Sequence, residues 1–420
     1  MNVFIRDVKI LDPQSTHHHK IVNVHIVNGE IKSIDKEEHH ADTIIDGQGQ
    51  LLSRGWFDLQ ANFNDPGLEH KEDIESGCAS AAHGGYTGVA TLPNTHPVIQ
   101  TKSHIEYIKS KSASHITDLY PIAAVTIDTK GEDLTEMLDL NHAGAIAFSD
   151  GEHTMWHTDM MLKSLIYLQK IDGLLINQPA DQLLNRFGTM NEGVPSTVLR
   201  LKGMPALAEH LMIKRDLDLL KYAGGKMHFS NISSKESVRL IKKAKEKGLN
   251  VTCDVSIHHL LHTEDDLYSY DSNFKISPPL RNEKDRKALI KGVKNGVIDV
   301  IVSAHTPHDE ECKKLEFDRA DFGLTGLQTM LPGLLSLAGT LTPEEWIEKI
   351  TTNPRTILKL ENSSIEENQV ANLTLIDPNK NWMLDDSTNQ SKSRNAPLFG
   401  TQLTGKVAAV FNQSKFEIFN

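Results

Sequence analysis

Strand-like and helix-like segments alternate eight times through the middle of the 420-residue chain, and this alternation restricts the fold more than any other feature of the sequence. Each strand candidate is a short apolar run bounded by turn or helix signals. The runs are Leu51–Gln60, Tyr86–Leu92, Leu119–Val125, Ala143–Ser149, Gly173–Asn177, Lys226–Ile232, Asn250–Val255 and Val297–Ser303. Eight successive β-then-α units favour an α/β fold of the TIM (β/α)8 barrel type over a doubly wound open sheet.

The clearest of the intervening helices is expected over Ser233–Lys247. Ser233 and Glu236 have the spacing of a capping box. Apolar residues then recur at helical spacing, and Gly248 stands just past the end, where a helix commonly stops. This segment predicts an amphipathic helix packed on the barrel.

Both ends of the chain have a different pattern, with short strands separated by turns. The dipeptide Asn28-Gly29 lies between two strand candidates and is typical of a two-residue hairpin turn. Further strands are expected over Leu373–Ile376 and Val407–Phe411. We therefore predict a composite domain, a small β-sandwich formed by residues 1–50 and 362–420, beside a barrel of residues 51–361.

The charge balance and the cysteines limit the class of protein. Lys and Arg number 44 and Asp and Glu number 56, so the net charge is −12, which argues against nucleic acid or an anionic membrane as the main partner. The three cysteines lie far apart and form no disulfide framework. The chain has neither an apolar run long enough to span a membrane nor a signal segment. These features predict a cytoplasmic protein.

In a TIM barrel, chemistry takes place at the carboxyl ends of the strands. The residues expected there are Gln60, Asn62, Asn94, Asp150, Gln178, Asn231 and Ala304. Only one of them is a carboxylate and none is a histidine. Because a catalytic metal ion is held by imidazole, carboxylate or thiolate ligands, this set indicates a polar pocket rather than a metal centre.

Several motifs, in one order along the chain, extend this reading. They are Gly55–Asp58, Asp65–Gly67, Lys71–Ile74, Gly84–Thr87, Leu92–Thr95, Phe148–Gly151, Lys275–Arg281, His305–His308 and Asn395–Pro397. Together they resemble the dihydroorotases of the amidohydrolase superfamily over nearly the whole chain. The resemblance implies a barrel with a small β domain made from both termini, a homodimer, and a role in pyrimidine biosynthesis, where the family hydrolyses the cyclic amide of dihydroorotate.

The departures from the family pattern fall on its metal ligands. The family's first strand ends Asp-x-His-x-His-x-Arg, whereas here Asp58 is followed by Gln60, Asn62 and Asn64 at those positions. By the same resemblance, the remaining ligand positions are Asp150, Gln178, Asn231 and Ala304. Ala304 stands where the family has the aspartate that also shuttles the proton. The corresponding substrate-binding positions are Asn64, Asn94, Ser277 and His308.

We therefore expect a non-catalytic dihydroorotase homologue that needs no cofactor and has no catalytic residue. The resemblance implies a scaffold or regulatory role beside aspartate transcarbamoylase or an active dihydroorotase, and a homo-oligomer.

Two alternatives stay open. The first is an active cyclic-amide hydrolase, a dihydroorotase whose zinc is held by relocated ligands. Those ligands would come from Asp150, His153, His157, His305 and His308. The second is a binding module that holds a small polar molecule with the carboxamides of Gln60, Asn62, Gln178 and Asn231 and does not react it.

Overall fold

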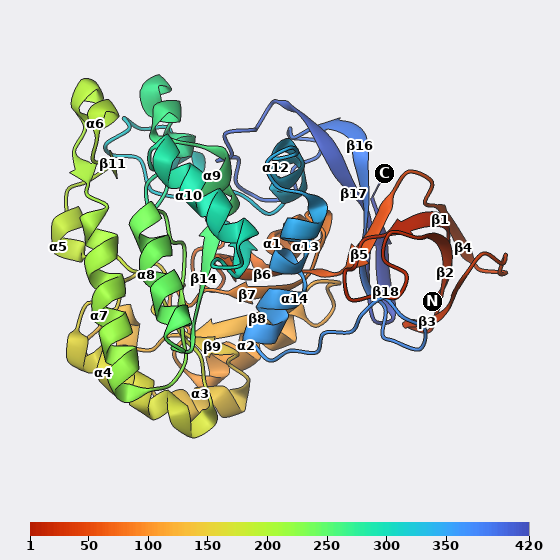
Figure 1. Cartoon of the computed structure of the whole chain (residues 1–420), viewed down its shortest axis with the longest axis horizontal. Coiled ribbons are helices and arrows are strands. Elements are labelled where there is room, and N and C mark those ends of the chain that lie inside the picture. Colours follow the sequence, from red (N-terminus) through yellow and green to blue (C-terminus); the bar gives the residue numbers. More distant parts are fainter. Residues whose placement is uncertain (420) are drawn as a thin grey trace.

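The computed structural model describes residues 1–419, and its larger part is a barrel of eight parallel strands (Figure 1). The strands are β6 (Trp56–Ala61), β7 (Tyr86–Thr91), β8 (Asp118–Ala123), β9 (Ala147–Phe148), β10 (Leu175–Asn177), β13 (Met227–Phe229), β14 (Val251–Ser256) and β15 (Val300–Val302). They pair in chain order, and Asn62 N donates to His305 O at 2.8 Å where the last strand meets the first. The predicted TIM-like barrel is confirmed, and each of the eight expected runs contains a strand.

Helices follow the strands and cover the outside of the barrel (Figure 1). They are α1 (Ile74–His83), α2 (Lys102–Ser112), α3 (Met137–Ala143), α4 (Thr158–Leu168), α5 (Gln182–Asn185), α6 (Val194–Leu199), α7 (Leu207–Ala223), α8 (Lys235–Glu246), α9 (Ile257–Leu261), α10 (Glu283–Lys294), α11 (Glu310–Lys313), α12 (Met330–Ser336), α13 (Pro343–Ile350) and α14 (Thr352–Ile357). A short pair, β11 (Met190–Asn191) and β12 (Gly203–Met204), precedes α7. Within residues 1–419, no helix is both long and apolar enough to cross a membrane.

Helix α8 occupies the segment predicted to be the clearest helix, but its N-cap lies one residue later in the sequence than expected. The N-cap is Ser234, whose hydroxyl accepts a hydrogen bond from Ser237 N. Ser233 is fully buried instead, and its hydroxyl donates to Glu209 of α7. The capping box of Ser233 and Glu236 was therefore wrong, because a buried carboxylate on a neighbouring helix takes the first serine.

The two ends of the chain build one mixed sheet beside the barrel, where red N-terminal and blue C-terminal strands lie together (Figure 1). Its strands are β1 (Asn2–Ile10), β2 (Ile21–Val27), β3 (Glu30–Asp35), β4 (Thr43–Asp46), β5 (Leu51–Arg54), β16 (Asn372–Met383), β17 (Gln402–Asn412) and β18 (Lys415–Ile418). The predicted hairpin at Asn28-Gly29 joins β2 to β3, with φ of 51° and 84° at its two residues. Side chains from both ends, such as Val3 and Phe411, share one apolar core.

The run expected as a single strand over Leu51–Gln60 is two strands, β5 and β6. The first pairs with β1 and β16 of the terminal sheet and the second with β7 of the barrel. Gly55 separates them where a Cβ atom would collide with the side chains of Asn372 and Thr87. The exact division into residues 1–50 with 362–420 and residues 51–361 stays a prediction.

A buried ion pair fastens the terminal sheet at this junction. Arg54 Nε donates to Asp12 Oδ2 at 2.9 Å, and Arg54 Nη1 donates to Asn362 Oδ1 at 2.9 Å. The same Asp12 oxygen accepts from Ile365 N at 2.9 Å. Three distant parts of the sequence thus meet at one buried ion pair, which ties the segment after α14 to the terminal sheet.

Candidate functional site

A cavity of about 260 Å³ opens at the carboxyl ends of the barrel strands. Four of the six positions that correspond to metal ligands in the resemblance line it, namely Gln60, Gln178, Asn231 and Ala304. They come from β6, β10, β13 and β15 or the residues just after these strands. The strands therefore bring together residues that are far apart in sequence, as expected for a barrel site.

The carboxamides in and beside the cavity are engaged with protein groups. Gln60 Oε1 accepts from the hydroxyl of Ser230, and Gln178 Nε2 donates to Ser277 O at 3.3 Å. Asn62 Nδ2 donates to Glu152 Oε1 at 2.8 Å. Gln60, Gln178 and Asn62 are each buried. These contacts order the side chains and place neutral donors and acceptors around the space.

Asp150 is buried and does not line the cavity. Its Oδ1 accepts from Val125 N at 3.0 Å and Thr126 N at 2.9 Å, and its Oδ2 accepts from Thr126 Oγ1 at 2.5 Å. Burial raises the pKa of this carboxyl to about 6, while the hydrogen bonds act in the opposite direction. The carboxylate thus secures the end of β9 to the end of β8.

Two residues of the cavity wall have left-handed backbone conformations. Asn231 has φ of 52° and Ala304 has φ of 50°. Asparagine tolerates this region, but alanine pays about 1–2 kcal/mol for it. The backbone at Ala304 therefore keeps a conformation that favours asparagine, aspartate or glycine, although the methyl group makes no polar contact.

His258 and His259 lie in the first turn of α9 and form a buried part of the wall. His259 Nε2 donates to Pro278 O at 3.1 Å, and burial lowers the pKa of this histidine to about 4. Burial also lowers the pKa of His258 far below its ordinary value. Both rings are therefore neutral at physiological pH. His259 Nδ1, His258 Nε2 and Asn231 Oδ1 are buried atoms without a hydrogen-bond partner among residues 1–419.

Of the four predicted substrate-binding residues, Ser277 lines the cavity and the other three do not. Asn94 Oδ1 accepts from Glu152 N at 3.0 Å, and Asn94 Nδ2 donates to Asp150 O at 3.1 Å. His308 Nε2 donates to Phe322 O at 2.9 Å. Asn64 Nδ2 reaches Pro307 O only at 3.5 Å. Asn94 and His308 thus position the loops around the mouth.

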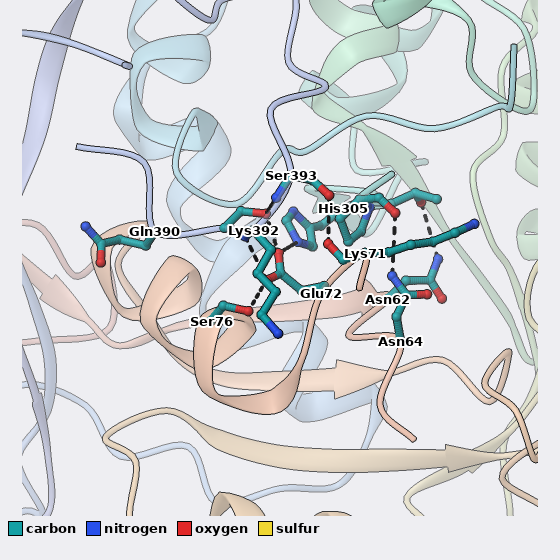
Figure 2. Close-up of polar contacts among 12 residues, drawn as sticks. Asn62, Asn64, Lys71, Glu72, Ser76, His305, Gln390, Lys392 and Ser393 are labelled. Carbon is teal, nitrogen blue, oxygen red and sulfur yellow. Dashed lines mark hydrogen bonds and ion pairs between the residues drawn. The ribbon is translucent and has the colours of Figure 1, made fainter. Parts of the chain in front are cut away.

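The loop after β6 is held by a buried carboxylate, Glu72, which accepts from several directions (Figure 2). Lys392 N donates to Glu72 Oε1 at 3.2 Å, and the hydroxyls of Ser76 and Ser391 also donate to this carboxylate. His305 Nε2 lies 3.4 Å from Glu72 Oε2, and His305 Nδ1 accepts from Gly326 N at 3.3 Å. His305 thus joins the loop after β6 to Gly326, while Glu72 holds the C-terminal segment at Ser391 and Lys392.

The other relocated ligands proposed from the sequence do not gather around one point of the cavity. His153 lines the cavity, and its Nδ1 pairs with Thr129 Oγ1 at 2.7 Å. His157 is the N-cap residue of α4 and lies outside the cavity lining. Within the described part of the chain, the groups of three close metal-ligand atoms are His18, His19 and Glu344, and His308, Cys312 and Asp321. Neither group lies in the cavity.

Sequence reasoning gave no role to Glu152, although it is the one charged side chain among the lining residues of the described chain. It is exposed at the mouth, and its position is fixed by Asn62 and Asn94. The signal was its place two residues after the strand-end Asp150. Polar groups at that distance from a barrel strand belong to the loops that shape the site.

The chain is similar to known proteins along nearly its whole length. A family model described as Dihydro-orotase-like matches residues 49–237, and one described as Amidohydrolase family matches residues 198–416. A dihydroorotase of Thermoanaerobacter sp. (strain X514) is 39% identical over 384 residues, which cover 90% of this chain and 89% of the relative. A dihydroorotase of Pelotomaculum thermopropionicum is 37% identical over 410 residues and 96% of each chain.

Solved structures support the fold. The structure of an L-hydantoinase (dihydropyrimidinase) from Arthrobacter aurescens superposes with a TM-score of 0.87 at 20% identity, covering 100% of this chain and 97% of the other. A dihydropyrimidinase from Brevibacillus agri NCHU1002 gives a TM-score of 0.83 at 20% identity, covering 100% of this chain and 95% of the other. At such identity the likeness concerns the architecture alone.

Proposed function

This chain belongs to the dihydroorotase family of the amidohydrolase superfamily, and from that membership we propose that it serves pyrimidine biosynthesis as a binding or regulatory protein that does not hydrolyse dihydroorotate. The observation that carries the proposal is the set of donors in the barrel mouth. Gln60, Gln178 and Asn231 offer neutral carboxamides there, and Ala304 offers a methyl group.

These residues do not fit a catalytic divalent ion. A metal centre that activates water needs about three protein ligands of the imidazole, carboxylate or thiolate type. Asp150 could supply charge, but both of its oxygens are occupied by hydrogen bonds from the end of β8. The cavity wall also has no carboxylate at Ala304 to move a proton. We therefore assign no hydrolytic step to the site.

A second candidate is an active dihydroorotase. The names of the relatives favour it, because the dihydroorotases that match at 37–39% identity carry that activity in their names. It requires relocated ligands to gather around one ion. His153 and His305 would have to leave their present partners, Thr129 and Glu72, to do so.

Zinc content and turnover, measured on the same purified sample, decide between the two. We expect less than stoichiometric zinc after growth with added zinc, and conversion of dihydroorotate to carbamoyl-aspartate no faster than in buffer. The dihydroorotase of Thermoanaerobacter sp. (strain X514), prepared in parallel, is the positive control. Stoichiometric zinc together with turnover would establish the second candidate.

The proposed role also needs a protein partner, and one surface suits it. Exposed apolar side chains are concentrated from α5 to the start of α7, where Leu183 is 80%, Phe187 64%, Val194 73% and Val198 60% exposed. Exposed apolar groups gathered on one side commonly mark a protein contact. We propose that a second copy of the chain docks here, and that aspartate transcarbamoylase or an active dihydroorotase is the regulated partner.

The dimer is tested by light scattering after gel filtration. We expect the mass of a dimer for the wild-type chain and that of a monomer for the double variant Leu183→Asp with Val194→Asp, because two carboxylates would have to be desolvated in the contact. Ile44→Asp, which charges an apolar residue 55% exposed on β4, is the matched control and should stay dimeric. A monomeric wild-type chain contradicts the dimer.

A further inference from the structure

We propose that the cavity at the barrel mouth binds a small molecule that donates N–H groups and carries no carboxylate. This inference rests on the proposed function, since it describes what a site without hydrolysis would hold. It differs from the family expectation, in which the ligand is the carboxylate-bearing dihydroorotate. The unpaired acceptors of the wall and its single charge carry the argument.

The wall offers hydrogen-bond acceptors that nothing in the protein satisfies. The proton of the neutral His259 ring is on Nε2, which donates to Pro278 O at 3.1 Å, so Nδ1 presents a lone pair. Asn231 Oδ1 is a second acceptor without a partner within residues 1–419. His259 and Asn231 are each 3% exposed. Both atoms are enclosed by protein, and leaving a buried polar atom unpaired costs about 1–3 kcal/mol, so a small side-chain movement that opens either atom to a ligand N–H would recover that energy.

The charge of the wall opposes an anion. Glu152 places a carboxylate at the mouth, and Asn62 occupies only its Oε1. The nearby Lys71 favours the charged form of Glu152, but its ammonium also lies 3.9 Å from Asp321 Oδ2, so two carboxylates share one ammonium and the mouth keeps a net negative charge. Asn64, at the position of the family's carboxylate-binding arginine, supplies no positive charge. A ligand carboxylate would therefore meet a net negative charge, and no further cation lines the cavity within residues 1–419.

Dihydrouracil and dihydroorotate test the proposal directly, because they share one ring and its N–H groups and differ by the carboxylate. Isothermal titration of the full-length wild-type chain is expected to show dihydrouracil binding at least roughly fivefold more tightly than dihydroorotate, the effect of one like-charge contact near a surface. Added salt should narrow this preference by screening the repulsion.

The variant Glu152→Gln keeps the size of the side chain and removes its charge. It should bind dihydroorotate at least roughly fivefold more tightly than the wild-type chain does. Glu106→Gln on α2 removes one exposed carboxylate outside the cavity and should leave both affinities unchanged. Thermal unfolding of each variant checks that it folds, and the salt series on the wild-type chain requires no variant at all.

Three results would overturn the proposal: no binding of dihydrouracil at millimolar concentration, equal or tighter binding of dihydroorotate by the wild-type chain, or a preference that neither salt nor Glu152→Gln alters. Chromatography of the titrated samples distinguishes a failure of this ligand proposal from a failure of the proposed function. Carbamoyl-aspartate in those samples would refute the absence of hydrolysis, whereas the order of the two affinities concerns the ligand class alone.

Discussion

Restoring ligands at the five substituted positions is expected to create zinc affinity at the barrel mouth. The variant combines Gln60→His, Asn62→His, Gln178→His, Asn231→His and Ala304→Asp. We expect its zinc Kd to be about 1 μM or lower, equivalent to ~8 kcal/mol of binding free energy, against no measurable binding by the wild-type chain. Imidazole and carboxylate are strong zinc ligands and carboxamides are not, so the donor chemistry alone sets the difference.

The backbone is already suited to these substitutions. Gln60, Gln178, Asn231 and Ala304 line one cavity, so their replacements would share a common space. At φ of 52° and 50°, positions 231 and 304 are left-handed, a conformation that histidine and aspartate tolerate better than alanine does. Ala304→Asp should therefore relieve backbone strain while it adds a ligand.

Competition titrations with a zinc indicator measure the affinity, and X-ray absorption identifies nitrogen and oxygen ligands. The control variant places alanine at positions 60, 62, 178 and 231, which removes the same carboxamides without adding imidazole, and should not bind zinc. A folded restored variant without zinc affinity would show that the strand ends no longer hold ligand geometry. Tight zinc binding at the mouth of the wild-type chain would contradict the proposed function itself.

Periodicity was sufficient to predict the barrel because each strand is a short apolar run between helical segments. It failed where one run crosses two sheets: Leu51–Gln60 is continuous in sequence, yet Gly55 divides it between the terminal sheet and the barrel. The cap of α8 was missed for a similar reason. Local spacing favoured Ser233, but the buried Glu209, 24 residues away in sequence, takes its hydroxyl.

The sequence predicted only those residues of the site that lie at the strand ends. Gln60, Gln178, Asn231 and Ala304 were placed in one pocket because barrel strands present their carboxyl ends together. The role of Glu152 was missed: its place two residues after Asp150 indicated only a loop near the site, and its contacts with Asn62 and Asn94 are what hold it at the cavity. The unpaired His259 Nδ1 likewise depends on the position of Pro278 O.

The replacement Arg281→Met is expected to lower the free energy of unfolding by about 3–5 kcal/mol, because it leaves a buried carboxylate without its counter-ion. Arg281 and Glu209 are 3% and 2% exposed, and Arg281 Nη2 lies 3.7 Å from Glu209 Oε2. The guanidinium also donates from Nε to Ser233 Oγ at 3.0 Å and from Nη1 to Met204 O at 2.8 Å. It thus joins α7, the segment just before α8 and β12.

Denaturant unfolding followed by circular dichroism measures the loss, and two variants show where it originates. Adding Glu209→Met to Arg281→Met removes the stranded charge and should recover part of the lost stability, as replacement of a whole buried ion pair by apolar groups often does. Arg239→Met breaks a pair on the exposed face of α8, where the partners are 58% and 38% exposed, and should cost less than ~1 kcal/mol. If Arg281→Met and Arg239→Met lower the free energy of unfolding by the same amount, the buried network does not hold these elements together. If the double variant is less stable than Arg281→Met alone, the hydrogen bonds of Glu209 to Ser233 and Ser237 matter more than its charge.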